Sequence, residues 1–111
     1  VSLFIEPKIS DIKKSKEINV DCVELHTGKY CRLFNMNKKT DNEFNKIKNA
    51  AIFAEKMKLE VHAGHGLTYK TTNKISKIKS ISEFNIGHFI ISESVFLGLK
   101  KTIHNFKRIL I

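Results

Sequence analysis

The sequence contains no tryptophan, one proline and only two cysteines. Two cysteines are too few for a disulfide framework or for a zinc site built from cysteine pairs, so we expect reduced thiols in a cytoplasmic protein. Cys22 falls in a predicted strand, where it is expected to be a small buried hydrophobic residue, and Cys31 falls in a predicted loop. No run reaches the roughly 18 consecutive apolar residues that a membrane helix needs, so no membrane partner is predicted.

Acidic residues are also in the minority. Lysine and arginine number 20 against 11 aspartates and glutamates, which gives a net charge of +9. The lysines are spread over segments that are predicted to be helical, where they would form solvated outer faces. No basic patch interleaved with aromatic residues accompanies them, so nucleic acid is not predicted as a partner.

The length of 111 residues suits one domain, covering residues 1–111, and 41% hydrophobic residues are enough for a modest core. The chain starts at Val1, without a methionine, and runs directly into the apolar segment 1–5. We therefore expect the sequence to be a piece of a longer protein.

Apolar runs and helical periodicity alternate along the chain. The pattern predicts strands at 1–5, 21–26, 59–63 and 83–86, and helices at 7–17, 44–58, 72–81, 89–97 and 99–110. Segment 29–39 is polar and irregular and is predicted to be a long loop. Thr40 and Glu43 have the spacing of a capping box at the start of the second helix.

Such alternation predicts an α/β fold with a parallel sheet covered by helices. Four strand–helix units are half of a (β/α)₈ TIM barrel, and a small doubly wound sheet is the alternative. An additional short helix after the last strand, preceded by Gly87 and His88, is typical of the phosphate site in such barrels and favours the barrel. In both folds, ligands bind at the carboxyl ends of the strands.

Several residues with useful chemistry lie at those ends. Glu24 and His26 are two apart on a strand and should face the same side, where Glu24 either stabilises positive charge or pairs with a lysine across the core. His65 follows the third strand between two glycines. If it faces inward together with Val61 and Ala63, it is a candidate general acid or base, and a structural core histidine is the alternative.

The remaining candidates are interpreted by the same arguments. His62 falls on the opposite face by parity and is interpreted as structural. Gly66 and Gly87 leave backbone amides open to an anion, and His88 either contacts a phosphate or caps the helix that follows. Glutamate and histidine at the strand ends are suitable metal ligands, but no helical ligand motif is present, so no metal is predicted.

Four segments in order carry a family resemblance: VSLFI at 1–5, VELHTG at 23–28, HAGHGLTY at 62–69 and NIGH at 85–88. Together they resemble pyridoxine 5′-phosphate synthase, and they match the C-terminal half of that enzyme, strands five to eight of its barrel. The resemblance implies condensation of 1-deoxy-D-xylulose 5-phosphate with 3-amino-2-oxopropyl phosphate, releasing phosphate and water. It also implies a cytoplasmic homo-octamer that uses no metal or organic cofactor.

The resemblance assigns roles residue by residue. Glu24 resembles the glutamate that stabilises the transition state, and His65 resembles the proton donor. Gly66, Gly87 and His88 resemble the residues that hold the phosphate of the amino-ketone. The family's other catalytic residues belong to its first four strands, which this chain lacks, and segment 29–39 is longer than expected. We therefore expect this chain alone to be inactive, and a non-catalytic phosphate-ligand binding module is the alternative function.

Overall fold

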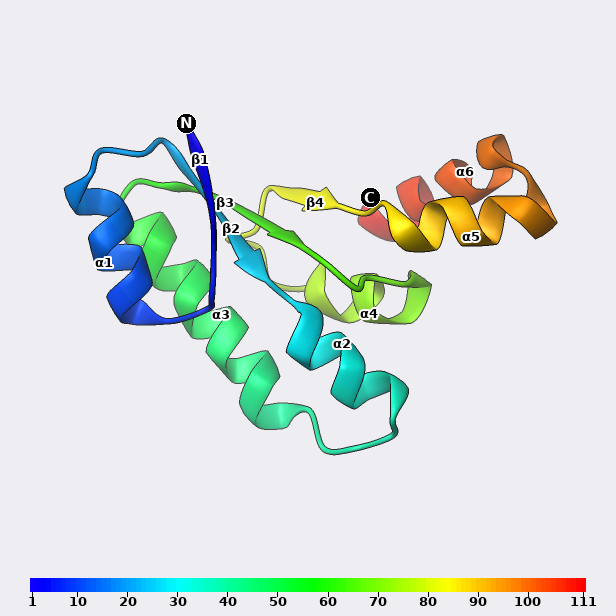
Figure 1. Ribbon diagram of the computed structural model, residues 1–111, viewed down its shortest axis with the longest axis horizontal. Helices are drawn as coiled ribbons and strands as arrows, with labels where there is room; N and C mark the ends of the chain where they lie inside the picture. The colour runs from blue at the N-terminus through cyan, green and yellow to red at the C-terminus, as the bar shows by residue number, and fades with distance from the viewer.

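A computed structural model describes all 111 residues, from Val1 to Ile111. Its strands and helices alternate through most of the chain (Figure 1). In order they are β1 Ser2–Ile5, α1 Ile9–Glu17, β2 Cys22–His26, α2 Gly28–Asn35, α3 Asp41–Lys56, β3 Glu60–Gly64, α4 Tyr69–Ile75, β4 Glu83–Asn85, α5 His88–Leu97 and α6 Leu99–Leu110. The predicted strands are confirmed to within a residue or two at their ends, and so is the predicted α/β class.

The four strands form one parallel sheet in the order β1-β2-β3-β4. Strands that are adjacent in the sequence are therefore adjacent in space, and the order never reverses. A doubly wound sheet requires such a reversal, so the alternative fold of the sequence analysis is not supported. Parallel strands also bring all four carboxyl ends to one edge of the sheet, which is where the candidate site forms.

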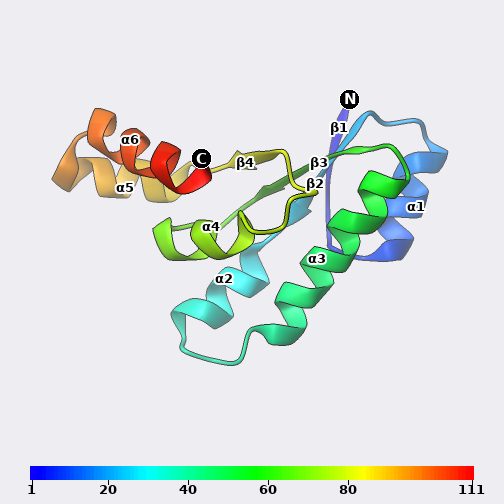
Figure 2. The same ribbon diagram turned by 180° about the vertical axis from the view of Figure 1, so that it is seen from behind.

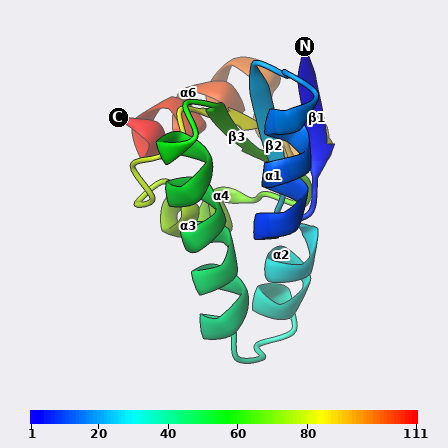
Figure 3. The same cartoon turned by 90° about the vertical axis from the view of Figure 1, so that its left-hand side faces the viewer.

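The two faces of the sheet have different surroundings. Val23, Leu25, Val61 and Ala63 are at most 2% exposed and form part of the core under the helices, which Figures 2 and 3 show on one side of the strands. The core is completed from the helices by Ile12 of α1, Tyr30 and Cys31 of α2, Ile47 of α3 and Ile75 of α4, among others. No helix packs on the other face, and Phe4 on that face is 54% exposed. The sheet thus has one covered face and one open face.

The predicted loop at 29–39 is wrong, because most of it is helix α2. Tyr30 and Phe34 are one helical turn apart, and their ring centroids lie 6.1 Å from each other. Tyr30 also meets Phe44 of α3 at 6.0 Å, and Cys31, predicted to lie in a loop, is a buried residue of the helix. The polar residues that indicated a loop occupy the outer face of a short amphipathic helix.

The predicted capping box at Thr40 is also wrong. Thr40 is the N-cap of α3, but its side chain makes no capping hydrogen bond. Glu43 turns away instead and forms ion pairs with Lys29 at 3.1 Å and Lys46 at 3.2 Å. A capping box does occur at α4, where Thr68 and Thr71 exchange side-chain hydrogen bonds with each other's backbone amides. This cap starts α4 at Tyr69, three residues before the predicted start.

The last two helices form a hairpin beside β4 (Figure 1). Phe106 of α6 is buried, and its ring centroid lies 4.7 Å from that of Tyr69 in α4. In α5, by contrast, Ile91, Val95 and Phe96 are 65%, 78% and 85% exposed. Neither helix, nor any other in the chain, combines the length and the apolar character needed to cross a bilayer.

Candidate active site

The end of β2 presents Glu24 and His26 on the open face of the sheet. Their neighbours Val23 and Leu25 are fully buried on the covered face, whereas Glu24 and His26 are half-buried. The prediction that the two side chains share a face is therefore confirmed. Neither is enclosed in the core in this chain, and Glu24 makes no ion pair with a lysine.

His65 reaches the site by a different route from the predicted one. Val61 and Ala63 lie on the covered face, so strand parity would have directed residue 65 into the core. The strand ends at Gly64, however, and His65 has a φ of 85°. This left-handed backbone is uncommon for a residue with a side chain, and such strain is concentrated at functional sites. It turns the imidazole of His65 out to the surface at the strand ends.

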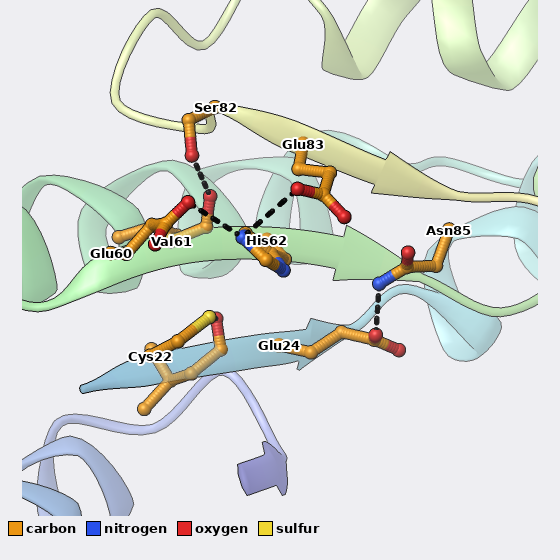
Figure 4. A network of polar contacts seen from close by, with 9 residues as sticks. Cys22, Glu24, Glu60, Val61, His62, Ser82, Glu83 and Asn85 are labelled. Atoms are coloured by element: carbon orange, nitrogen blue, oxygen red, sulfur yellow. Dashed lines mark hydrogen bonds and ion pairs between the residues drawn. The ribbon is translucent and has the colours of Figure 1, made fainter. Parts of the chain in front are cut away.

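Strand parity holds for His62, whose side chain lies on the face opposite to Val61 and Ala63, as predicted. The predicted inward face was the wrong one, because the face of Val61 and Ala63 is the covered core and the face of His62 is the open one. His62 pairs in register with Glu24 and shares the open face with it. Figure 4 shows His62 between two carboxylates, with its Nε2 atom 3.1 Å from Glu60 and 3.5 Å from Glu83. The imidazole therefore takes part in a polar network with the first residues of β3 and β4.

A compact group of rings fixes the position of His65. Its ring centroid lies 4.6 Å from that of His26, and His26 stacks on Phe4 at 4.8 Å. The backbone amide of Gly28 donates to Nδ1 of His26 at 2.9 Å, so Nδ1 is the acceptor and the proton of the neutral ring is on Nε2. The hydroxyl of Thr27 donates to the carbonyl of His65 at 2.8 Å. The first residues of α2 thus support both histidines.

Four of the five predicted site residues line one cavity of about 520 Å³. His65 and Gly66 come from the end of β3, and Gly87 and His88 come from the start of α5. The first-turn amides of a helix lack partners within the helix and carry partial positive charge, so α5 directs an anion-binding terminus at this cavity. The structure thus brings together the histidine and the glycine amides that the sequence placed on different strands.

The two glycines differ in what they require. Gly66 has a φ of 78°, and a Cβ atom there would lie 3.1 Å from the Cβ of Cys31. Glycine at position 66 is therefore needed by the fold. Gly87 has an ordinary negative φ of −125°, and a Cβ atom there would meet nothing within 4 Å. The space beside Gly87 is open and available to a ligand.

A second cavity of about 670 Å³ adjoins the first and shares His65, Gly66 and Asn35 with it. Helix α2 contributes Lys29 and Arg32 to its lining. These two cations lie where a phosphorylated ligand would benefit from positive charge. The sequence analysis missed them because it interpreted their segment as a loop.

Glu24 is joined to the first cavity through Asn85. The side-chain amide of Asn85 donates a hydrogen bond to Oε1 of Glu24, as Figure 4 shows. Asn85 lines the cavity together with Gly87 and His88. It belongs to the NIGH segment that carried the family resemblance, yet no role was predicted for it. The signal was present, since a polar residue two positions before Gly87 lies at the end of a strand.

The histidines and glutamates at the carboxyl ends of the strands, which could act as metal ligands, do not gather around a common point. The group that does is Cys22, Glu60 and His62, whose ligand atoms lie within 4.8 Å of one another. Burial, together with the nearby carboxylates, raises the pKa of the Cys22 thiol, and Glu60 already binds His62. The hydrogen bond between Glu60 and His62 and the burial of Cys22 account for the closeness of the three side chains without an ion. A transition metal would have to displace these contacts to bind here.

Burial also raises the pKa of the Cys31 thiol, which lies under Gly66. A reactive cysteine needs a lowered pKa and access to solvent, and Cys31 has neither. Cys22 is likewise buried, as predicted. Neither thiol is therefore a candidate nucleophile.

The family described as "Pyridoxal phosphate biosynthesis protein PdxJ" matches residues 1–111, the whole chain. The chain belongs to the PdxJ family. Relatives named pyridoxine 5′-phosphate synthase include one from Pelagibacter ubique, 60% identical over 108 residues, and one from Sulfurihydrogenibium, 45% identical over 111 residues. A third, from Ehrlichia canis, is 46% identical over 110 residues.

These PdxJ relatives are much longer than the chain. The matched segments cover 97% to 100% of the chain but only 44% to 45% of each relative. The part matched is their C-terminal half, as the sequence analysis expected. The candidate site therefore lies in a chain that matches the C-terminal half of the PdxJ relatives and spans less than half of their length.

Proposed function

We propose that this chain forms strands five to eight of a (β/α)₈ barrel, and that the first four strands complete it. Three observations support the barrel: the sheet is parallel with strands in sequence order, its helices lie on one face, and its other face is open. In a barrel the helices surround the strands and the inner face meets the opposite strands. The open face that carries Glu24 and His62 is then the barrel interior.

The completed protein would be a pyridoxine 5′-phosphate synthase. It condenses 1-deoxy-D-xylulose 5-phosphate with 3-amino-2-oxopropyl phosphate to pyridoxine 5′-phosphate, releasing phosphate and water. The observation that carries this proposal is the cavity in which His65 and Gly66 meet Gly87 and His88 at the start of α5. It combines an acid–base group with an anion-binding helix terminus, which is what a reaction between phosphorylated substrates needs.

Gly66, Gly87 and His88 hold the phosphate of the amino-ketone in this proposal. The open space beside Gly87 leaves the first amides of α5 free to donate to phosphate oxygens. His88 is exposed at the first position of that helix, where its ring nitrogen can contact the same anion. The helix amides and His88 would thus hold the substrate without taking part in bond formation.

His65 is the proton donor and Glu24 the stabiliser of positive charge. Ring closure releases water, and a hydroxyl leaves only when it takes up a proton, which an imidazole facing the cavity can supply near neutral pH. Condensation of an amine with a ketone passes through a cationic iminium. A fixed carboxylate lowers the energy of such a cation.

The wider setting follows from the family resemblance. We propose a cytoplasmic homo-octamer that uses no metal or organic cofactor and has neither nucleic acid nor membrane as partner. The exposed Ile91, Val95 and Phe96 on α5 support contacts with other protein surfaces, because monomeric proteins rarely expose contiguous apolar patches of this kind.

The test is the variant His65→Asn in the complete enzyme. Asparagine keeps a polar side chain but cannot donate a proton in the same way, so turnover should fall about a hundredfold or more. Binding of either substrate, followed by calorimetry, should change little. His104→Asn is the matched control, because His104 lies on α6 away from the cavity.

Unchanged turnover in His65→Asn would show that His65 is not the proton donor. If the unmodified complete protein binds both phosphorylated substrates and releases no product, the protein is a phosphate-ligand binding module instead.

A further inference from the structure

Glu24 and Asn85 are joined across an intervening strand. Glu24 lies on β2 and Asn85 on β4, 61 residues apart, and β3 runs between them. The amide of Asn85 nevertheless donates to Oε1 of Glu24, and in Figure 4 the two side chains extend toward each other over β3. A side-chain contact between next-nearest strands requires the middle strand to leave room.

Gly64 provides that room. It is the register partner of both His26 on β2 and Asn85 on β4. A Cβ atom at position 64 would lie 2.6 Å from Oε2 of Glu24, 3.0 Å from its Cδ and 3.2 Å from the Cβ of Asn85. The bare backbone of Gly64 is therefore the space that the carboxylate of Glu24 occupies.

No other side chain holds the carboxylate. His62 is the register partner of Glu24, but its Nε2 atom faces Glu60 and Glu83 instead. Asn85 is therefore the one side chain that forms a hydrogen bond to Glu24. A glutamate has three rotatable side-chain bonds, so this bond and the space at Gly64 determine where its charge points.

We propose that Asn85 is a positioning residue for Glu24, and that Gly64 is the space in which the positioned carboxylate lies. This inference rests on the proposed role of Glu24 as a stabiliser of positive charge. An amide suits the task because it donates a hydrogen bond without adding a charge. A lysine or arginine in its place would neutralise the carboxylate and weaken its effect on a cationic intermediate.

The first test is Asn85→Ala in the complete enzyme. Loss of a hydrogen bond to a charged group should lower kcat about ten- to a hundredfold, because the carboxylate becomes free to rotate. The KM for each substrate should stay within about twofold, since Asn85 acts through Glu24. Asn73→Ala, on the exposed side of α4, is the matched control and should behave like the unmodified enzyme.

Two further variants separate positioning from a merely structural role. Asn85→Asp places a second carboxylate beside Glu24, and two such close charges resist ionising together, so the acid limb of the kcat profile should move to higher pH. Gly64→Ala should keep the thermal stability nearly unchanged, because the nearest atoms are the flexible end of Glu24. Its kcat should nevertheless fall, because the carboxylate has to move.

A double-variant cycle decides between the proposals. If Asn85 acts through Glu24, then Asn85→Ala causes no further loss in a Glu24→Gln background. Full activity of Glu24→Gln alone would overturn the proposed role of Glu24. The positioning role would be overturned if Glu24→Gln lowers kcat while Asn85→Ala has a normal kcat, or if the losses in kcat of the two variants multiply in the double variant. Either outcome would leave the proposed function intact. Should Asn85→Ala unfold, the pH profile of Asn85→Asp and the kcat of Gly64→Ala give the same decision.

Discussion

At the scale of single residues, the site depends on small backbone features that give side chains unusual positions. His65 reaches the cavity only because the chain adopts a φ of 85° directly after β3. Glu24 reaches Asn85 only because residue 64 has no side chain. Neither position follows from the periodicity of a strand, since one lies beyond the strand and the other depends on a neighbour. The functional geometry therefore depends on the exceptions to the regular pattern.

Gly87 offers a residue-scale prediction because the fold itself tolerates a side chain there. Its φ is negative and its missing Cβ would meet nothing, so Gly87→Val should fold with an unchanged Tm. The valine would occupy the space of the phosphate and keep it from the amides of α5. The KM for 3-amino-2-oxopropyl phosphate should rise about tenfold. Steady-state kinetics measures this, and the KM for 1-deoxy-D-xylulose 5-phosphate is the internal control.

An equal rise in both KM values would contradict the assignment of Gly87 to one substrate. An unchanged KM would place the phosphate elsewhere.

At the scale of elements, the limits of the sequence analysis are clear in α2. Every strand was located, because each is a compact apolar run between turn residues. Helix α2 was missed because only Tyr30, Cys31 and Phe34 face inward, and a two-turn helix gives little periodicity. The missed helix carries Lys29 and Arg32 to the second cavity. The error in local structure thus became an omission in the site.

Helix α2 is attached to α3 through Glu43. Burial opposes ionisation of this carboxyl, but hydrogen bonds and charge from Lys29 and Lys46 outweigh it and lower its pKa. A lowered pKa in the folded state adds stability that is present above the unfolded value, about 4.3, and is lost as the pH falls through the folded one. The lysine side chains are 59% and 57% exposed, so the contribution is modest.

Glu43→Gln should therefore lower the free energy of unfolding at pH 7 by about 1 kcal/mol. The difference from the unmodified protein should disappear as the pH drops below the folded pKa of Glu43. Thermal unfolding at both pH values measures it, with Glu55→Gln, an exposed residue of the same helix, as control. A difference that persists unchanged at low pH would mean that packing, and not the ion pairs, is responsible.

At the scale of the whole molecule, the open face of the sheet is the dominant feature. A parallel sheet covered by helices was predictable from the alternation of elements, whereas the strand order was not predictable from alternation alone, because a doubly wound sheet has the same alternation. The position of His65 was not predictable, because strand parity predicts a face only while the strand continues. His62 lies opposite to Val61 and Ala63, as parity predicted, whereas His65 does not share their face, because β3 ends at Gly64. The grouping of candidate residues at the carboxyl ends of the strands did not depend on parity, because parallel strands bring those ends together in either case.

The open face also leads to a prediction about the complete barrel. Phe4, Glu24 and His62 lie on a face with no covering layer, and β1 and β4 each have an edge without a neighbouring strand. Closure with four further strands would pair both edges and cover the face. We expect the chain alone to form no pyridoxine 5′-phosphate. Mixing it with the N-terminal half of the Pelagibacter ubique relative, which is 60% identical in the matched half, should restore turnover.

Size-exclusion chromatography should then show the two pieces eluting together. A chain carrying Glu24→Gln should assemble with the N-terminal half as readily as the unmodified chain, but the resulting complex should turn over slowly. This result would separate assembly from catalysis. Joining the two pieces in one polypeptide provides a form that does not depend on their affinity. Activity of the chain alone at the rate of the joined form would contradict the half-barrel proposal, because a site lacking the first four strands would then suffice. An inactive joined form that folds and binds both substrates would contradict the assignment of synthase chemistry to these strand ends.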